Sequence, residues 1–97
     1  MIIDKTIDSL AKKYSLSPED FIKHGSTLTL REKKRALQIE RIEILARYEA
    51  ETVNVLKEKI KQSAVPEHPA WEDLIEIKNI EAEIKAIDDD IRTLQAA

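Results

Sequence analysis

The chain has 97 residues, a mass of 11.1 kDa and a formal net charge of −3, which is enough for one small domain. A single glycine, three prolines and 36% charged residues are atypical of β-proteins, because hairpin turns consume glycine. The absence of cysteine excludes disulfides, zinc–thiolate sites and a cysteine nucleophile.

Two short helices are predicted in residues 1–28, the head of the chain. Apolar residues recur at steps of three and four between residues 4 and 14, which predicts the first helix. Ser17 followed by Pro18 is a typical helix start, with proline in the first helical position. The only glycine, Gly25, precedes two weak helix formers, and we expect the second helix to end there.

A long helix is predicted over residues 29–65. The segment from Thr29 to Glu32 has the pattern of a capping box, and no proline interrupts the chain before Pro66. The apolar stripe of this helix is well over 100° wide. A stripe of that width touches more than one neighbour, so we expect contacts with the rest of the chain and with a second chain or a foreign partner.

The third segment, residues 66–97, consists of a proline-containing hinge and a C-terminal heptad helix. Its apolar residues repeat every seven positions in two sets, the pattern of a coiled-coil seam. The first set is Ile77, Ile84 and Ile91, and the second is Ile80, Ile87 and Leu94. We therefore predict one all-α domain over residues 1–97, with two short helices followed by a long antiparallel αα-hairpin with coiled-coil character.

The seam and the only tryptophan are the candidate partner-binding residues. Trp71 opens the last helix beside the hinge, and tryptophan is enriched at interaction hot spots. The seam candidates are Ile77, Ile80, Ile84, Ile87, Ile91 and Leu94. Each of these seven side chains could instead pack inside the hairpin. Isoleucine at both seam positions favours assemblies of more than two strands, so we expect a homo-oligomer or a protein partner.

Charge is unevenly distributed along the chain. Residues 1–35 carry a net charge of +3 and residues 67–97 a net charge of −6. The acidic last helix fits a basic surface on a protein partner. The basic cluster of the first third comprises Arg31, Lys33, Lys34 and Arg35. These four are candidate nucleic-acid contacts, with a solvated helical turn as the alternative.

Nothing in the sequence predicts catalysis, a metal ion or a cofactor. Glu40 with Glu43, and Asp73 with Glu76, have spacings that resemble the magnesium-binding pairs of MazG-type nucleotide pyrophosphatases. On a wheel of the long helix, Glu40 and Glu43 face away from the last helix, so the two pairs are not expected to share an ion. We therefore expect a protein that is not an enzyme. Without an apolar run of about 18 residues or a signal-like start, we expect no membrane contact and a cytoplasmic location.

Two short segments resemble known families. Residues 7–22, IDSLAKKYSLSPEDFI, resemble the helix–turn–helix part of ribbon-helix-helix proteins, and residues 68–76, HPAWEDLIE, resemble small helical prokaryotic proteins of toxin–antitoxin pairs. The resemblance implies an antitoxin-like partner of a toxin that acts by burying apolar helical faces. Only Met1–Ile3 precede the first predicted helix in this sequence, so we do not expect the DNA-reading N-terminal strand of that family here. The alternatives are a DNA-binding regulator that uses the head and a purely structural homo-oligomeric coiled coil.

Overall fold

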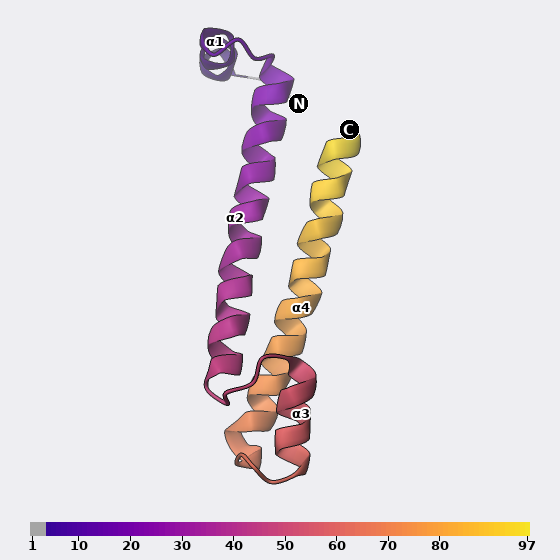
Figure 1. The fold of residues 1–97 in the computed structure, drawn as a ribbon. Helices are drawn as coiled ribbons and strands as arrows, with labels where there is room; N and C mark the ends of the chain where they lie inside the picture. Colours follow the sequence, from indigo (N-terminus) through magenta and orange to yellow (C-terminus); the bar gives the residue numbers. More distant parts are fainter. Residues whose placement is uncertain (1–3) are drawn as a thin grey trace.

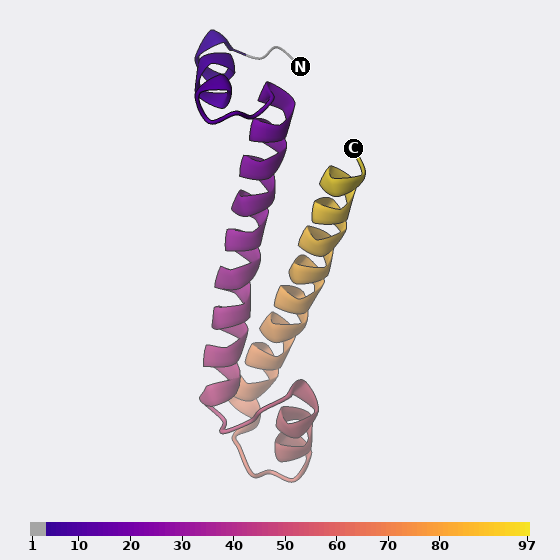
Figure 2. The same cartoon turned by 45° about the horizontal axis from the view of Figure 1, so that its top comes forward.

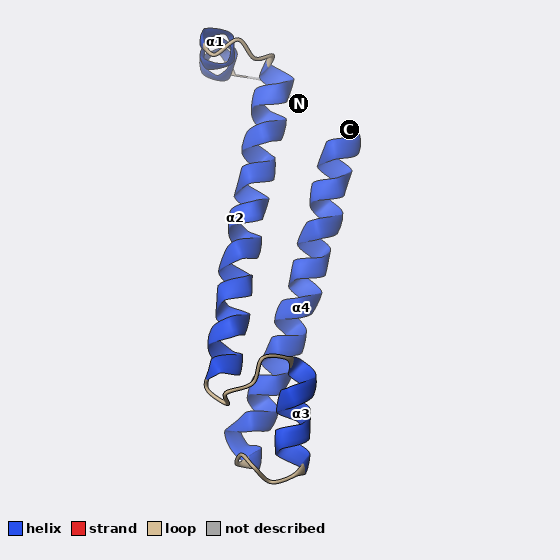
Figure 3. Cartoon of the chain, in the orientation of Figure 1, coloured by secondary structure: helices blue, strands red, loops and turns tan. Residues whose placement is uncertain are grey.

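The computed structural model describes residues 4–97, and that part of the chain contains helices and no strand. The four helices are α1 (Lys5–Lys13), α2 (Pro18–Ala46), α3 (Val53–Lys61) and α4 (Glu67–Ala96). The all-helical prediction is therefore confirmed for these residues (Figure 3). The predicted absence of an N-terminal strand concerns Met1–Ile3, which lie outside the described residues.

The two long helices, α2 and α4, lie side by side and run in opposite directions (Figure 1). They diverge toward the end of the molecule where α1 and the C-terminal turns of α4 lie, which we call the open end (Figure 2). The short helix α3 packs against α4 at the other end, the closed end. The molecule is elongated: its radius of gyration is 19.7 Å, against about 12.5 Å for a compact domain of this length.

Both predicted helix starts in the head are confirmed. The Asp4 carboxylate accepts a hydrogen bond of 2.7 Å from the Thr6 backbone N–H and caps α1. The Ser17 hydroxyl accepts a hydrogen bond of 3.1 Å from the Asp20 backbone N–H, and Pro18 occupies the first position of α2. α1 lies beside the beginning of α2, and the short turn over residues 14–17 joins the two helices.

The predicted helix end at Gly25 is wrong, because α2 continues through this glycine to Ala46. The hydroxyl groups of the two threonines that follow form hydrogen bonds within the helix. Thr27 donates to the Lys23 carbonyl at 2.9 Å, and Thr29 donates to the Gly25 carbonyl at 3.0 Å. One glycine costs a helix only about 1 kcal/mol. The predicted boundary between residues 28 and 29 is therefore not a helix boundary.

Gly25→Ala is expected to raise the free energy of unfolding by about 0.5–1 kcal/mol, because alanine restricts the unfolded chain and fits the helix. A Cβ atom built at Gly25 has no atom within 4 Å. Urea denaturation followed by circular dichroism measures the change. A loss of stability would show that the helix is not formed at this position in solution.

The predicted continuous helix over residues 29–65 is also wrong, because α2 ends at Ala46 and α3 begins at Val53. Glu49 has a positive φ of 51°, and its backbone N–H donates to the Ala46 carbonyl at 3.1 Å. The Ala50 N–H donates to the Leu45 carbonyl at 3.1 Å, which completes a Schellman motif. Ser15 and Ser63, the other two residues between 4 and 97 with positive φ, end α1 and α3 in the same way.

The proline-containing hinge before the last helix is confirmed. His68 has an extended backbone with φ −112° and ψ 129°, so regular α4 begins at Pro69. Within the described residues no helix is long and apolar enough to cross a membrane.

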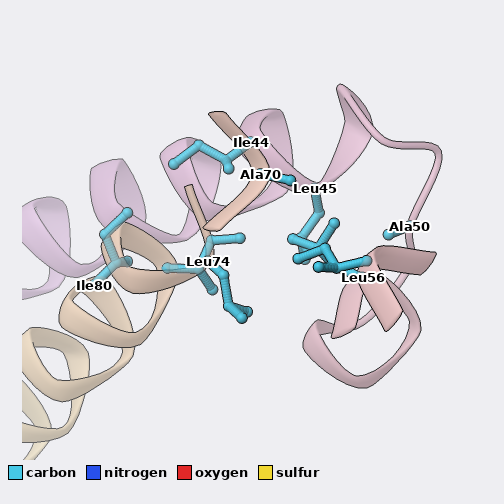
Figure 4. Packing of buried hydrophobic residues seen from close by; sticks show 9 residues of the cluster. Ile44, Leu45, Ala50, Leu56, Ala70, Leu74 and Ile80 are labelled. Atoms are coloured by element: carbon cyan, nitrogen blue, oxygen red, sulfur yellow. The ribbon is translucent and has the colours of Figure 1, made fainter. Parts of the chain in front are cut away.

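The hydrophobic core lies at the closed end, where α2 and α3 both contribute buried residues next to α4 (Figure 4). It is formed by Ile44, Leu45, Ala50, Leu56, Ile60, Ala70, Leu74, Ile77 and Ile80. The heptad residues Ile77 and Ile80 belong to this core, whereas Ile84 and Ile87 farther along α4 are only partly buried. Ile91, near the end of α4, is buried again. The pair of long helices is thus closely packed at one end and incompletely covered toward the other.

Candidate functional site

The structure places the seven predicted partner-binding residues in different environments. Ile77, Ile80 and Ile91 are buried within the chain. Ile84, Ile87 and Leu94 are partly buried, and the Trp71 side chain is 42% exposed. The alternative of packing inside the chain therefore applies to the first three and to Ile84, which packs against the core, and Trp71 is the most accessible of the set.

Further apolar side chains lie on the outside of the pair of long helices. On α2 they are Leu28, Ile39 and Ile42, which we call the outer stripe. Ile42 is 61% exposed, and helical spacing places the stripe about 140–160° around α2 from the buried Ile44. On α4, Ile75 is 58% exposed. The sequence contained a signal for the stripe, since the apolar arc predicted for the long helix was too wide for a single neighbour.

A groove of about 520 Å³ lies between residues 30–37 of α2 and residues 83–90 of α4. It is lined by Leu30, Lys33, Ala36, Leu37, Glu83, Ala86, Ile87 and Asp90. Apolar side chains make up most of the lining. Lys33 stands on the α2 side, and two carboxylates stand on the α4 side.

Carboxylates continue from this groove toward the closed end. The Glu40 pKa is raised above its ordinary value of 4.5, first by a hydrogen bond with Glu76, then by partial removal from water, and then by repulsion from Glu76, Glu83 and Glu43. The prediction that Glu40 faces away from the last helix is therefore wrong. We call Glu40, Glu76, Glu83 and Asp90 the acidic margin. No group of three acidic or histidine side chains within residues 4–97 is arranged to hold a metal ion.

Stability is expected to increase as the pH falls from neutral through the raised pKa of Glu40, because the folded state holds the Glu40 proton more tightly than the unfolded chain. This contribution is lost as the pH rises through the raised pKa. Glu40→Gln removes the repulsion, so the variant is expected to be more stable at neutral pH and less dependent on pH. Thermal unfolding at several pH values measures the slope. Glu51→Gln, which removes a charge from the α2–α3 linker, should keep the wild-type slope, and equal slopes in all three proteins would contradict the assignment.

A polar cluster that the sequence did not reveal joins the end of α2 to the start of α4. Asp73 is 9% exposed, and the Tyr48 hydroxyl donates to one of its oxygens. The Arg47 guanidinium lies 3.5 Å from the other oxygen. Burial and then the bond to Asp73 raise the pKa of Tyr48 to about 12, so its hydroxyl stays protonated and acts as a donor. The cluster therefore serves to fix the two helices at the closed end.

Lysine side chains donate hydrogen bonds to backbone carbonyl groups at both ends of the pair formed by α2 and α4. Lys59 Nζ on α3 donates to the Tyr48 and Glu49 carbonyls at 2.8 and 3.2 Å. Lys23 Nζ on α2 donates to the Gln95 and Ala97 carbonyls at 3.3 and 3.1 Å. A cation at these positions is favourable because helix C-termini carry partial negative charge.

The four basic candidates for nucleic-acid contact do not share one surface. Lys34 Nζ lies 2.7 Å from the Asp88 carboxylate, and Lys33 lines the groove. Arg31 lines a separate hollow of about 480 Å³ at the open end. Arg35 is exposed, about one turn along α2 from Arg31. Their contact with nucleic acid stays a prediction.

Comparison with known proteins gave one match. A family model described as "Uncharacterized protein MJ0235 family" matches residues 1–97. No curated protein and no solved structure matches the chain.

Proposed function

We propose that this chain, which belongs over its whole length to the MJ0235 family, is a small protein–protein interaction module that works by burying apolar helical surfaces. The observation that supports this most is its excess of exposed surface. The accessible area is 7175 Å², against about 5,700 Å² for a folded monomer of this mass. The excess exceeds the roughly 800 Å² that each partner contributes to a standard interface.

The outer stripe of α2 and the exposed face of α4 supply the contact residues in this proposal. Ile42 and Ile75 are more than half exposed, and large apolar patches on soluble proteins commonly mark interaction sites. Trp71 adds an aromatic side chain beside the hinge, of a type that often dominates binding energy. Burial of these side chains by a partner supplies the driving force, and no catalytic step is involved.

We also propose a finer description of the fold and of the role of the chain. α2 and α4 form an antiparallel hairpin with coiled-coil character, held by the heptad residues of α4. The role is antitoxin-like: the helical surfaces cover a partner protein and block it sterically. The net charge of −6 in residues 67–97 supports a partner with a basic surface.

Site-specific photocrosslinking in cells that produce the chain tests this function. A benzophenone amino acid placed at Ile42 or Ile75 is expected to give one recurrent protein adduct, identified by mass spectrometry. The same amino acid at Glu51 or Glu58, which are exposed outside the outer stripe, serves as the control. No adduct at positions 42 and 75, or the same adducts from all four positions, would contradict the proposal.

A further inference from the structure

The groove between α2 and α4 combines an apolar floor with charged edges. The floor consists of Leu30, Ala36, Leu37, Ala86 and Ile87. The lining residues on each long helix recur at steps of three and four over about two turns, so the floor runs parallel to both helix axes. A floor of this shape matches the side chains of a third helix laid along it, as neighbouring helices do in a bundle.

The charge around the groove is predominantly negative. Glu83 and Asp90 stand on its α4 edge, opposite Lys33 on α2. The acidic margin continues beyond the groove through Glu40 and Glu76. The hydrogen bond that protonated Glu40 can donate to Glu76, and the repulsion when both are charged, raise the pKa of Glu40. Positive side chains placed along this margin would relieve the repulsion, whereas a second negatively charged helix would increase it.

The apolar floor and the negative edge determine which side chains an occupant of the groove needs. We propose that the groove binds an amphipathic helix of a partner protein, with apolar residues at helical spacing and lysine or arginine at its flanks. This inference rests on the proposed function and names the kind of partner. A second copy of the chain is a poor occupant through its own α4, because residues 67–97 carry a net charge of −6.

The probe for this proposal is an 18-residue peptide of leucine and lysine with leucines at helical spacing. A control peptide has the same composition but alternates leucine with lysine, which gives a strand-like pattern. Calorimetric titration of the full chain at physiological salt is expected to show saturable binding of one helical peptide, with the alternating peptide about tenfold weaker or worse. Absence of saturable binding, or equal binding of both peptides, would overturn the proposal.

Two matched pairs of variants locate the binding site. Glu83→Lys reverses a charge at the groove, and Glu81→Lys makes the same change about 160° away around α4. Ala36→Trp fills the floor, and Gln38→Trp adds the same bulk about 160° away around α2. Glu83→Lys and Ala36→Trp are expected to weaken peptide binding about tenfold, and the two controls less than about twofold.

The remaining outcomes are equally decisive. Equal losses in Glu83→Lys and Glu81→Lys would mean long-range attraction without a groove site, and unchanged binding in Ala36→Trp would place the peptide elsewhere. Light scattering tests whether a second copy of the chain occupies the groove. If the chain alone forms a dimer and Ala36→Trp dissociates it, the proposal is overturned. Circular dichroism verifies that each variant is folded. If the peptide fails to bind while crosslinks form from Ile42 and Ile75, this inference fails and the interaction function stands.

Discussion

Leu56→Ala is expected to lower the free energy of unfolding by about 3–4 kcal/mol, because it removes buried methyl groups and leaves a cavity. Leu56 is fully buried, and it joins α3 to the part of the core that contains Leu45 and Leu74 (Figure 4). A loss of this size is a large share of the total stability of a 97-residue domain, about 5–15 kcal/mol. Urea denaturation followed by circular dichroism measures it.

Val55→Ala is the matched control, since Val55 is the preceding residue of α3 and is 39% exposed. Its expected cost is less than about 1 kcal/mol. Equal and small costs for the two variants would mean that α3 does not pack against the long helices in solution. A large cost for Val55→Ala alone would place the opposite face of α3 in the core.

Asp73→Ala is expected to cost about 2–3 kcal/mol, because it removes a buried, charged hydrogen-bond acceptor and leaves the partly buried Tyr48 hydroxyl without its partner. Asp89→Ala, a change of the same kind at an exposed position of α4, is expected to cost less than about 1 kcal/mol. Equilibrium unfolding in urea compares the two variants.

A double-mutant cycle separates this contact from the other effects of the substitution. Tyr48→Phe removes the hydroxyl donor and leaves the ring in place. The double variant is expected to lose about 1–2 kcal/mol less than the sum of the single variants, since both substitutions delete one interaction. Strict additivity would show that Tyr48 and Asp73 do not interact in solution.

The helical class and the start of α2 could be predicted from the sequence, because capping residues act locally, but the capping-box pattern at Thr29–Glu32 lies inside α2 and starts no helix. Ser17 with Pro18 is an example in which the side chain and the proline ring fix the start without help from distant residues. The ends of the helices were harder to predict from the sequence. The one glycine, Gly25, lies inside α2, while Glu49 adopts the left-handed conformation usually taken by glycine. Tertiary packing of Leu45 and Ala50 stabilises that turn, and local propensity does not contain this information.

The α2–α3 break also left a local signal. Residues 52–55, Thr-Val-Asn-Val, are four weak helix formers in succession, and Thr52 caps α3 by accepting a hydrogen bond of 3.2 Å from the Val55 N–H. Residues 29–65 form two helices, so a single wheel over all of them combines two different phases. Glu40 lies about 60° around α2 from Leu37, at the margin of the face that packs on α4 and beside Glu76, and this wheel does not distinguish the margin from the outer face.

The heptad pattern of α4 predicts a seam but not the molecule that fills it. Ile77 and Ile80 pack inside the chain, whereas Ile87 lines the groove, although all three satisfy the same pattern. Intramolecular and intermolecular packing bury the same side chains and differ only in connectivity. Sequence periodicity alone does not distinguish them.

Placement of the core at the closed end determines how the chain folds. Leu45, Leu56 and Leu74 are close in sequence, so bringing them together closes only short loops and costs little chain entropy. Such local topology gives a low contact order and rapid folding. We therefore expect the closed end to form first and the long helices then to extend their pairing toward the open end. Backbone amides around Leu74 are accordingly expected to exchange their hydrogens more slowly than those in the last turns of α4.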